Sequence, residues 1–208
     1  GSGPCRTVEL TAKALGIKLN YKQLDLMVKK DQLAPEFIKI NPQHCVPTIV
    51  DNGFSLCEGN VIATYLIQKY AKNDSLYPKD PKQRAIVDHK LYFNNGVLYQ
   101  RFAEYFYPIM LYKQTPDPEK FKKIEEALQF LDIFLEEKDF LAGDSVTVAD
   151  FAVSSTLVTF DVMKIDRSAY KNVTKWFKNV QTSVVGFEEI NGVEKLTKIF
   201  EEYRKHLN

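Results

Sequence analysis

Residues 46–57 carry the strongest local signal in the sequence: Val-Pro-Thr-Ile-Val-Asp-Asn-Gly-Phe-Ser-Leu-Cys. Two short apolar runs flank the Asn-Gly dipeptide at 52–53, which is typical of two-residue hairpin turns because both residues tolerate positive φ. We therefore predict a β-hairpin over residues 48–57. The Val46–Pro47 bond enters this tight turn and is predicted to be cis, which leaves the preceding backbone free to pair with an extended peptide.

On either side of the hairpin the pattern becomes helical. After it, residues 58–70 have the apolar spacing of an amphipathic helix. Towards the N-terminus we predict a helix over 4–15, because Pro4 suits the first helical position and Gly16 suits the C-terminal cap. Residues 21–27 alternate in polarity and are predicted to form a strand. The order helix, strand, long loop, hairpin, helix indicates an α/β domain.

After residue 80 the sequence shows no further pair of strands. Residues 74–81 contain two prolines and no periodicity, so we predict a linker there. Residues 82–112 are expected to form one helix or two, broken near Gly96 or Pro108. Further helices are predicted at 121–135, from the Thr147–Asp150 capping box onward, at 173–180 and at 188–206. The second part of the chain is therefore predicted to be all-helical.

The composition suits two globular domains, over 1–75 and 82–208, in a chain of 208 residues. Hydrophobic residues make up 45% and charged residues 26%, which argues against disorder. A net charge of +1 argues against nucleic acid or an acidic membrane surface as partners. No apolar run approaches the roughly 18 residues of a membrane helix. The three cysteines fit neither a disulfide framework nor a metal cluster. We expect a reduced, cytoplasmic protein without a metal site.

Four features near the first helix and the hairpin combine into a candidate site. Ser2 and Cys5 lie at the start of the first helix, where unpaired N–H groups and the helix dipole favour an anion. The Ser-Gly-Pro-Cys spacing resembles the Cys-Gly-Pro-Cys of thioredoxin-like redox proteins, but a serine hydroxyl stabilises another molecule's thiolate instead of exchanging disulfides. His44, ahead of Pro47, is a candidate donor to a carboxylate. Glu58, at the start of a helix, is a candidate partner for an ammonium group.

Each of these residues also has a purely structural interpretation. Ser2 can be a tag remnant and Cys5 a packed thiol. His44 can pack its loop, and Glu58 can be an acid that the helix dipole favours. The sequence alone leaves these alternatives open.

Over almost its whole length the chain resembles the cytosolic glutathione transferases, and most closely the insect delta class. The matching fragments are Ser-Gly-Pro-Cys-Arg (2–6), Pro-Glu-Phe-Ile-Lys-Ile-Asn-Pro-Gln-His (35–44), Val-Pro-Thr-Ile-Val-Asp-Asn-Gly-Phe (46–54), Ser-Leu-Tyr-Pro-Lys (75–79), Arg-Ala (84–85) and Leu-Ala-Gly-Asp-Ser-Val-Thr-Val-Ala-Asp (141–150). Each fragment is weak alone, but their order along the chain is specific. The resemblance implies a thioredoxin-like domain followed by a helical bundle domain, a homodimer, glutathione as co-substrate, and detoxification of hydrophobic electrophiles.

The resemblance assigns roles to five residues of the candidate site. Ser2 matches the serine that donates a hydrogen bond to the glutathione thiolate. Val46 matches the residue whose backbone pairs with the cysteinyl group of glutathione, ahead of a cis proline at Pro47. His44 matches a histidine near the glycyl end, and Glu58 matches the acid that binds the γ-glutamyl ammonium group.

Three positions near these residues depart from the family pattern. Gly59 stands where the family has a serine that holds the γ-glutamyl carboxylate, Asn60 where the delta class usually has an arginine, and Gln32 where the family has a histidine. Losing one charged and one neutral hydrogen bond costs roughly 2–4 kcal/mol. We therefore predict weak glutathione binding with a high KM.

The electrophile is expected in an apolar pocket between the two domains. Aromatic side chains crowd residues 99–110 more densely than a core requires. By resemblance, the candidate electrophile site consists of Tyr105, Phe106, Met110 and Phe187. The alternative is that this helix is buried on two sides and that any one of these residues is core. Trp176 is predicted to lie in the core.

The predicted function is conjugation. The thiol of glutathione ionises beside Ser2, and its thiolate attacks an electrophilic carbon. Gly59 and Asn60 keep a second interpretation open, a catalytically impaired relative that carries hydrophobic ligands. Thiol–disulfide or dehydroascorbate chemistry through Cys5 is disfavoured because serine occupies the attacking position.

The fold implied by the resemblance has a strand at the centre of its sheet ahead of Gly1. We expect that about seven upstream residues are absent from the sequence or, alternatively, that Gly1-Ser2 is a cloning remnant. A sheet without this strand would leave N–H and C=O groups of its neighbours unpaired.

Overall fold

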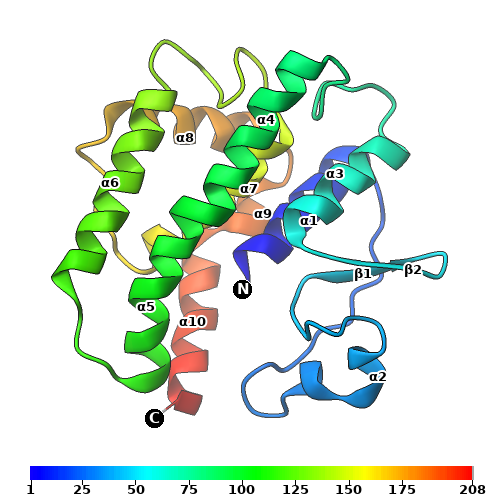
Figure 1. Cartoon of the computed structure of the whole chain (residues 1–208), viewed down its shortest axis with the longest axis vertical. Helices are drawn as coiled ribbons and strands as arrows, with labels where there is room; N and C mark the ends of the chain where they lie inside the picture. The colour runs from blue at the N-terminus through cyan, green and yellow to red at the C-terminus, as the bar shows by residue number, and fades with distance from the viewer. Residues whose placement is uncertain (208) are drawn as a thin grey trace.

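The computed structural model describes residues 1–207 and contains a small α/β part beside a larger helical part (Figure 1). The α/β part consists of α1 (Gly3–Leu15), the 3-10 turn η1 (Asp31–Leu33), α2 (Pro35–Ile38), β1 (Thr48–Asp51), β2 (Phe54–Cys57) and α3 (Gly59–Tyr70). The helical part consists of α4 (Pro81–Phe93), the π-helical turn η2 (Asn94–Tyr99), α5 (Gln100–Tyr112), α6 (Pro118–Phe134), α7 (Val148–Val162), α8 (Lys171–Ser183), α9 (Phe187–Asn191) and α10 (Val193–Leu207). The predicted fold class is confirmed.

The predicted hairpin is present. Strands β1 and β2 pair antiparallel, with Asp51 opposite Phe54 at the turn. Asn52 and Gly53 join them with φ angles of 51° and 85°. Positive φ at both central residues is what a type I′ turn requires, so the Asn-Gly dipeptide closes the hairpin at little conformational cost.

Helix α1 begins and ends where the sequence predicts. Pro4 lies in its first turn, where a missing N–H group costs no helical hydrogen bond. Gly16 ends the helix with φ 68°, and its N–H group bonds back to the carbonyl oxygens of Ala12 and Lys13. This left-handed cap is easiest for a residue without Cβ.

The prediction of a strand at 21–27 is wrong. Strands β1 and β2 are the only ones among residues 1–207, and 26–29 forms a turn. A strand is maintained by hydrogen bonds to a neighbouring strand, and 21–27 has no such neighbour in the described chain. Instead the Asp25 carboxylate accepts hydrogen bonds from the N–H groups of Met27 (3.0 Å) and Val28 (2.9 Å), which stabilises the turn.

Residues 82–112 belong to two helices that follow each other directly. Helices α4 and α5 are joined through η2, which contains Gly96 (Figure 1). Pro108 lies inside α5 without ending it. The helix predicted at 188–206 is divided at Gly192 into α9 and α10.

One hydrophobic core joins the two parts. Nearly every residue of α7 is buried, and α7 packs against α1, α4 and α10. Leu10 of α1 and Ala63 of α3 belong to the same core. Trp176 is fully buried, as predicted, and the capping box of Thr147 and Asp150 is confirmed at the start of α7. The start of α1 is therefore held against the helical part.

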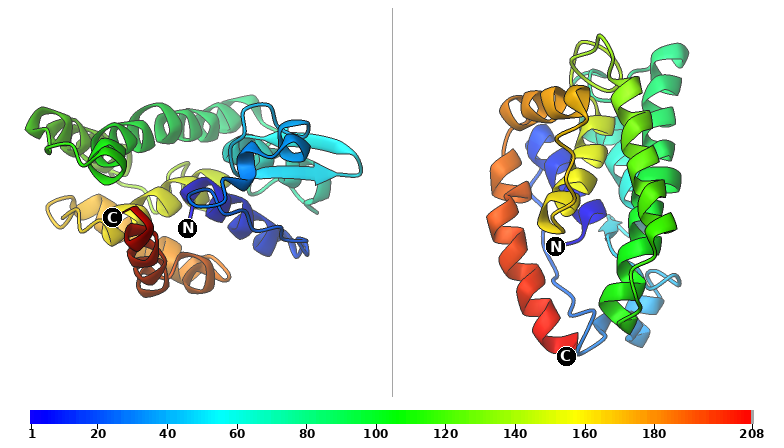
Figure 2. Two further views of the ribbon diagram at one scale, coloured as in Figure 1. Left: turned by 90° about the horizontal axis from the view of Figure 1, so that it is seen from below. Right: turned by 90° about the vertical axis from the view of Figure 1, so that its left-hand side faces the viewer.

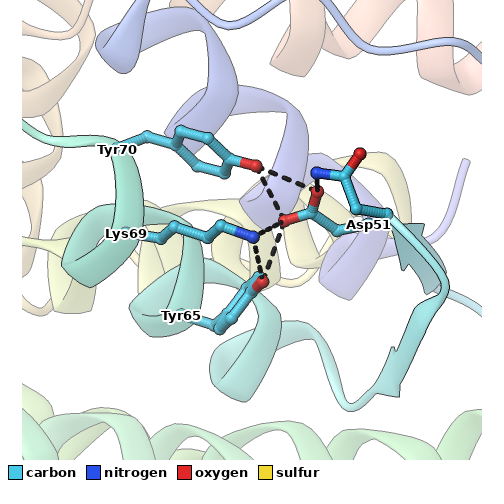
Figure 3. Close-up of polar contacts among 5 residues, drawn as sticks. Asp51, Tyr65, Lys69 and Tyr70 are labelled. Atoms are coloured by element: carbon cyan, nitrogen blue, oxygen red, sulfur yellow. Dashed lines mark hydrogen bonds and ion pairs between the residues drawn. The ribbon is translucent and has the colours of Figure 1, made fainter.

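A second anchor ties the hairpin to the end of α3. Asp51 at the end of β1 accepts hydrogen bonds from Tyr65 (2.8 Å), Lys69 (2.8 Å) and Tyr70 (2.8 Å), as Figure 3 shows. The Lys69 ammonium, together with the two hydroxyls, lowers the pKa of Asp51 from 3.8 to about 2. The carboxylate is therefore ionised at all pH values above this range.

Replacing Asp51 by asparagine is expected to destabilise the protein in a pH-dependent way. A carboxylate with a lowered folded-state pKa stabilises the fold above its unfolded pKa of 3.8, and this contribution is lost as the pH falls through about 2. The difference in unfolding free energy between wild type and Asp51→Asn should therefore shrink from pH 4 downwards, as urea unfolding at a series of pH values would show. A difference that does not change with pH would contradict the assignment.

Candidate functional site

The hydroxyl of Ser2 lies at the N-terminus of α1 and is not used to cap that helix. Ser2 has the extended backbone of an N-cap residue, and its carbonyl oxygen accepts the Arg6 N–H at 3.1 Å, but its side chain makes no capping hydrogen bond. Ser2 is half-buried, and a Cβ on Gly1 would lie 3.5 Å from Ile199 of α10. In Figures 1 and 2 the N-terminus, at the start of α1, accordingly lies between the hairpin and α10. The hydroxyl is available to a ligand there.

The thiol of Cys5 is held in the protonated form. Cys5 is half-buried and forms no disulfide, and Ser2 lies near its side chain. Burial raises the pKa of Cys5 and outweighs the opposing effect of Ser2. A thiol with a raised pKa is a weak nucleophile, which favours the packing role for Cys5.

A buried arginine in the first turns of α1 adds positive charge near Ser2, and no sequence pattern indicated it. Arg6 donates to Asn191, to the Ser155 carbonyl (2.8 Å) and to Thr159 (2.7 Å), all neutral groups. Its Nη2 would lie 3.7 Å from a Cβ on Gly3. Burial lowers the pKa of Arg6 to about 10, so it remains charged at neutral pH. Because its direct partners carry no negative charge, its field favours an anion near Ser2.

The loop before the hairpin has the predicted backbone. The Val46–Pro47 peptide bond is cis, as predicted. His44 is exposed and takes a positive φ of 44°. The structure places both residues in the loop that enters β1, and the ligand contacts predicted for them stay predictions.

Asn41, a residue that sequence reasoning missed, holds this loop in place. Asn41 is buried, and its Nδ2 donates to the carbonyl oxygen of Cys45 (3.1 Å) and to Thr48 Oγ1 (2.9 Å). Its backbone carbonyl accepts the His44 N–H at 2.9 Å. The sequence shows only an Asn-Pro dipeptide at 41–42. Its importance comes from burial, because a buried amide needs several hydrogen-bond partners, and burial depends on the fold.

Glu58 sits between β2 and α3 in a strained backbone conformation. Its φ is 71° and its ψ is 105°, and the side chain is exposed and makes no capping hydrogen bond. A non-glycine residue in this region costs about 1–3 kcal/mol, and such strain is concentrated at functional sites. The carboxylate is therefore free to meet a ligand, which argues against the purely structural interpretation.

Gly59 is required by the close approach of α3 to α1. A Cβ at this position would lie 2.8 Å from both Cβ and the carbonyl oxygen of Pro4. Both distances are shorter than real Cβ contacts, and one of the atoms is rigid backbone. The serine that the family pattern has here would not fit without moving α3 from α1.

Gly59→Ser is accordingly expected to lower the free energy of unfolding by about 1–3 kcal/mol, the usual cost of overpacking. It should not improve glutathione affinity. Urea unfolding and a glutathione titration would measure the two effects. Gly96→Ala is the matched control, since nothing lies within 4 Å of the added Cβ and alanine favours helix over glycine. A stable Gly59→Ser variant with tightened binding would contradict the packing explanation.

The side-chain amides of Asn60 and Gln32 donate hydrogen bonds to backbone carbonyl oxygens. Asn60 Nδ2 donates to the Leu91 carbonyl of α4 at 3.2 Å, and Gln32 Nε2 donates to the Leu26 carbonyl at 3.1 Å. The Oε1 atom of Gln32 is buried and has no hydrogen-bond partner among the described residues. Gln32 therefore retains a buried acceptor without a partner, and the amide nitrogen of Asn60 joins α3 to α4.

Three of the four predicted electrophile residues lie together on α5. Tyr105, Phe106 and Met110 are all half-buried, and the rings of Tyr105 and Phe106 meet edge to face at 4.8 Å. Phe106 also stacks on the buried Phe102 at 4.7 Å. These residues combine a packed side with a solvent-accessible side, as a binding surface requires.

Phe187 is buried in the core and does not lie on α5 with the other three predicted electrophile residues. Only 3% of its surface is exposed, and its ring packs edge to face on Phe177 of α8 at 5.8 Å. It begins α9 and belongs to the core that joins the two parts. Its resemblance-based assignment to the electrophile site is therefore corrected to a packing role.

A pair of tyrosine hydroxyls on η2 and α5 was not singled out by the sequence. The hydroxyl oxygens of Tyr99 and Tyr107 lie 2.6 Å apart. Burial raises the pKa of Tyr99, and the charge of Arg6 opposes this shift. Tyr99 therefore remains protonated close to the first turn of α1. Two tyrosines eight positions apart across a π-turn give no recognisable sequence pattern, which explains why the pair was missed.

Two surface grooves lie away from the predicted site residues. A groove of about 610 Å³ and a smaller one of about 160 Å³ both border α10, and none of the predicted site residues lines them. The geometry around Ser2 is therefore a better guide to the site than groove size. Within residues 1–207 no three His, Cys, Asp or Glu side chains are grouped to hold a metal ion. No helix of the described chain is long and apolar enough to cross a membrane.

The hairpin with its cis proline, the helix N-terminus at Ser2 and the attached helical part define a two-domain protein with a thioredoxin-like first domain. Residues 1–74 match the N-terminal domain of glutathione S-transferases, and residues 99–183 match their C-terminal domain. The chain belongs to the glutathione transferase family.

Solved structures from insects support this assignment. The chain is similar to a delta-class glutathione transferase of Nilaparvata lugens, with 47% identity, a TM-score of 0.92, and coverage of 100% of this chain and 96% of that one. A Bombyx mori glutathione transferase shares 40% identity over 95% of this chain and 93% of the other, with a TM-score of 0.90. An epsilon-class glutathione S-transferase of the housefly, Musca domestica, shares 36% identity over 100% of this chain and 94% of the other, with a TM-score of 0.89.

Proposed function

We propose that the protein conjugates glutathione to hydrophobic electrophiles. The observation that carries the proposal is the free hydroxyl of Ser2 at the start of α1, close to the unpaired cation of Arg6. Lowering the pKa of a thiol from near 9 towards 7 requires about 2–3 kcal/mol. One charge-assisted hydrogen bond and a helix dipole together supply about this amount. The bound thiol would therefore ionise without a basic side chain.

Glutathione is proposed to lie extended along the loop before the hairpin. The backbone of Val46, ahead of the cis bond to Pro47, would pair with its cysteinyl group. His44 would meet the glycyl end. Glu58, whose carboxylate is exposed, would bind the γ-glutamyl ammonium group. Gln32 has an unused acceptor on the same α/β part.

The γ-glutamyl carboxylate is the weak point of this arrangement. Gly59 has no side chain, and Asn60 is uncharged and uses its amide nitrogen in a bond to the Leu91 carbonyl, so neither offers the carboxylate a charged donor. The proposal therefore includes weak glutathione binding.

The electrophile is proposed to bind against Tyr105, Phe106 and Met110 of α5. The half-buried aromatic surface would hold an apolar ring while the thiolate attacks from the side of Ser2. In this division residues 1–75 bind glutathione and residues 82–208 carry the electrophile site. The reaction class fits detoxification in the cytoplasm.

A carrier of hydrophobic ligands is the second candidate, and the loss of side-chain donors at Gly59 and Asn60 favours it. The two functions are separated by measuring turnover of a chlorodinitrobenzene electrophile with glutathione beside displacement of a hydrophobic dye. Glutathione-dependent turnover supports the transferase. Dye binding without turnover at saturating glutathione would support the carrier.

A homodimer is proposed from family membership. Large apolar side chains are exposed on the hairpin, α3 and α4, and a second copy could cover them: Val50, Phe54, Val61 and Tyr92. Analytical ultracentrifugation should find twice the mass of one chain. A monomer at micromolar concentration would contradict this.

A further inference from the structure

Two cysteines outside the proposed mechanism lie next to each other at the entrance of the hairpin. Thr48 of β1 is paired with Cys57 of β2. The Thr48 hydroxyl donates to the carbonyl oxygen of Cys45 at 2.9 Å and thereby folds the preceding loop back towards Cys57. Cys45 lies close enough to Cys57 to add to the effect of burial in raising the pKa of the Cys57 thiol. Strand pairing and loop folding thus bring together two residues twelve positions apart in the sequence.

Both thiols are chemically available. Cys45 and Cys57 are free and half-buried, so small molecules can reach them. Cys45 Sγ has two polar neighbours, the Nδ2 of Asn41 at 3.3 Å and the Oε1 of Gln43 at 3.9 Å. Burial raises the pKa of Cys57, so its thiol stays protonated up to a higher pH than an exposed cysteine thiol. Because an N–H donor lies beside its sulfur, Cys45 is assigned as the attacking thiol and Cys57 as the resolving one.

We propose that Cys45 and Cys57 form a redox-active dithiol that a low-molecular-weight disulfide converts to an intramolecular disulfide. The Cys45 thiolate attacks one sulfur of glutathione disulfide, which forms a mixed disulfide and releases one glutathione thiolate. Cys57 loses its proton to solvent, its sulfur attacks Cys45 Sγ, and the second glutathione leaves as a thiolate. Two protein thiols are oxidised, and one glutathione disulfide is reduced to two glutathione molecules.

The position of the pair gives the disulfide a consequence for the site, and this step rests on the proposed function. Cys45 directly precedes Val46, and Cys57 directly precedes Glu58, so each cysteine adjoins one proposed glutathione anchor. A disulfide holds its two sulfur atoms about 2 Å apart, closer than any contact between two free thiols. The backbone at both anchors therefore shifts, and oxidation should weaken glutathione binding.

The test begins with fully reduced protein equilibrated with glutathione and glutathione disulfide at a series of ratios. Remaining thiols are trapped by alkylation and counted by mass spectrometry, and linked peptides are mapped. The expected result is a fall from three free thiols to one per chain, with Cys45 joined to Cys57. In the Cys5→Ser variant the number of free thiols per chain should fall from two to none. Cys57→Ser should stop at a mixed disulfide on Cys45, and Cys45→Ser, which lacks the attacking thiol, should form neither a mixed nor an internal disulfide.

Several results would overturn the proposal: three thiols that persist, a link through Cys5, or a wild-type reaction that stops at the mixed disulfide. Peptide mapping of the wild type requires no variant, so the test stands even where a substitution impairs folding. For the effect on the site, oxidised protein should lose most of its conjugation activity and regain it with dithiothreitol, and Cys45→Ser should resist the loss. Unchanged activity of the disulfide form would overturn the switch. A disulfide that forms in a protein without any conjugation activity would instead refute the proposed function and leave the dithiol standing.

Discussion

Ser2→Ala is expected to lower kcat/KM for glutathione conjugation by about 10–100-fold, since a hydrogen bond to a charged group is worth roughly 1.5–3 kcal/mol. The hydroxyl makes no capping bond to α1, so its removal takes nothing from the hydrogen bonds of the helix. Its loss raises the pKa of the bound thiol instead, and the pH midpoint of activity should move upwards. A pH profile of kcat/KM measures both effects.

Ser2→Thr is the matched variant because it keeps the hydroxyl and remains a good N-cap residue. It should retain the wild-type pH midpoint and most of the activity. Thermal unfolding of both variants should stay close to wild type. A Ser2→Ala enzyme with an unchanged pH profile would remove Ser2 from the mechanism and leave thiol ionisation to the helix dipole and Arg6.

The parts of the fold that sequence reasoning predicted correctly are those with a local cause. Asn52 and Gly53 form the hairpin turn because they accept positive φ, and Gly16 ends α1 for the same reason. The capping box at Thr147 depends only on residues three positions apart. Such features depend on a few neighbouring residues, so a short stretch of sequence is sufficient to specify them.

The strand predicted at 21–27 failed because its cause is not local. Alternating polarity indicates that a segment fits a sheet, but a strand forms only when a partner supplies hydrogen bonds. Among residues 1–207 no partner is in place beside 21–27, and the Asp25 carboxylate stabilises a turn. The same limit applies to Gly59, whose explanation lies in Pro4 on a different helix.

For the candidate site, the sequence indicated which residue types are present but not what they contact. Asn60 was correctly noted as the loss of a charged donor, yet only the structure shows its amide bonded to the Leu91 carbonyl. Phe187 fitted the composition of an apolar pocket but is buried against Phe177. Arg6 looked like an ordinary polar residue of a helix, and its burial against α7 and α9 depends on three-dimensional packing.

Asp150 is expected to be the most sensitive position for stability. Its carboxylate is fully buried and accepts four hydrogen bonds, two at each oxygen. Oδ1 accepts the Leu141 N–H (2.9 Å) and the Trp176 Nε1–H (2.7 Å). Oδ2 accepts the Thr147 N–H (2.8 Å) and the Thr147 hydroxyl (3.2 Å). These bonds join the start of α7 to the loop before it and to α8.

Asp150→Ala should therefore lower the free energy of unfolding by about 4–5 kcal/mol, because it leaves several buried donors without an acceptor. For a chain of this length such a loss lowers Tm by about 10–20 °C. Asp150→Asn should be almost as damaging. An amide has a single oxygen, so its NH₂ group would face two of the donors that the carboxylate now accepts.

Differential scanning calorimetry of three variants separates this network from a simple loss of charge. Asp144→Ala removes an exposed acid six positions earlier and should change stability by no more than about 0.5 kcal/mol. Trp176→Phe keeps a smaller aromatic ring and removes one donor while leaving a cavity, so its effect should be smaller than that of Asp150→Ala, which leaves all the donors to Asp150 without an acceptor. If Asp150→Ala unfolded within a few degrees of Asp144→Ala, the four hydrogen bonds would not be what fixes the start of α7. The close packing of α7 against α1 would then have to hold Ser2 in position on its own.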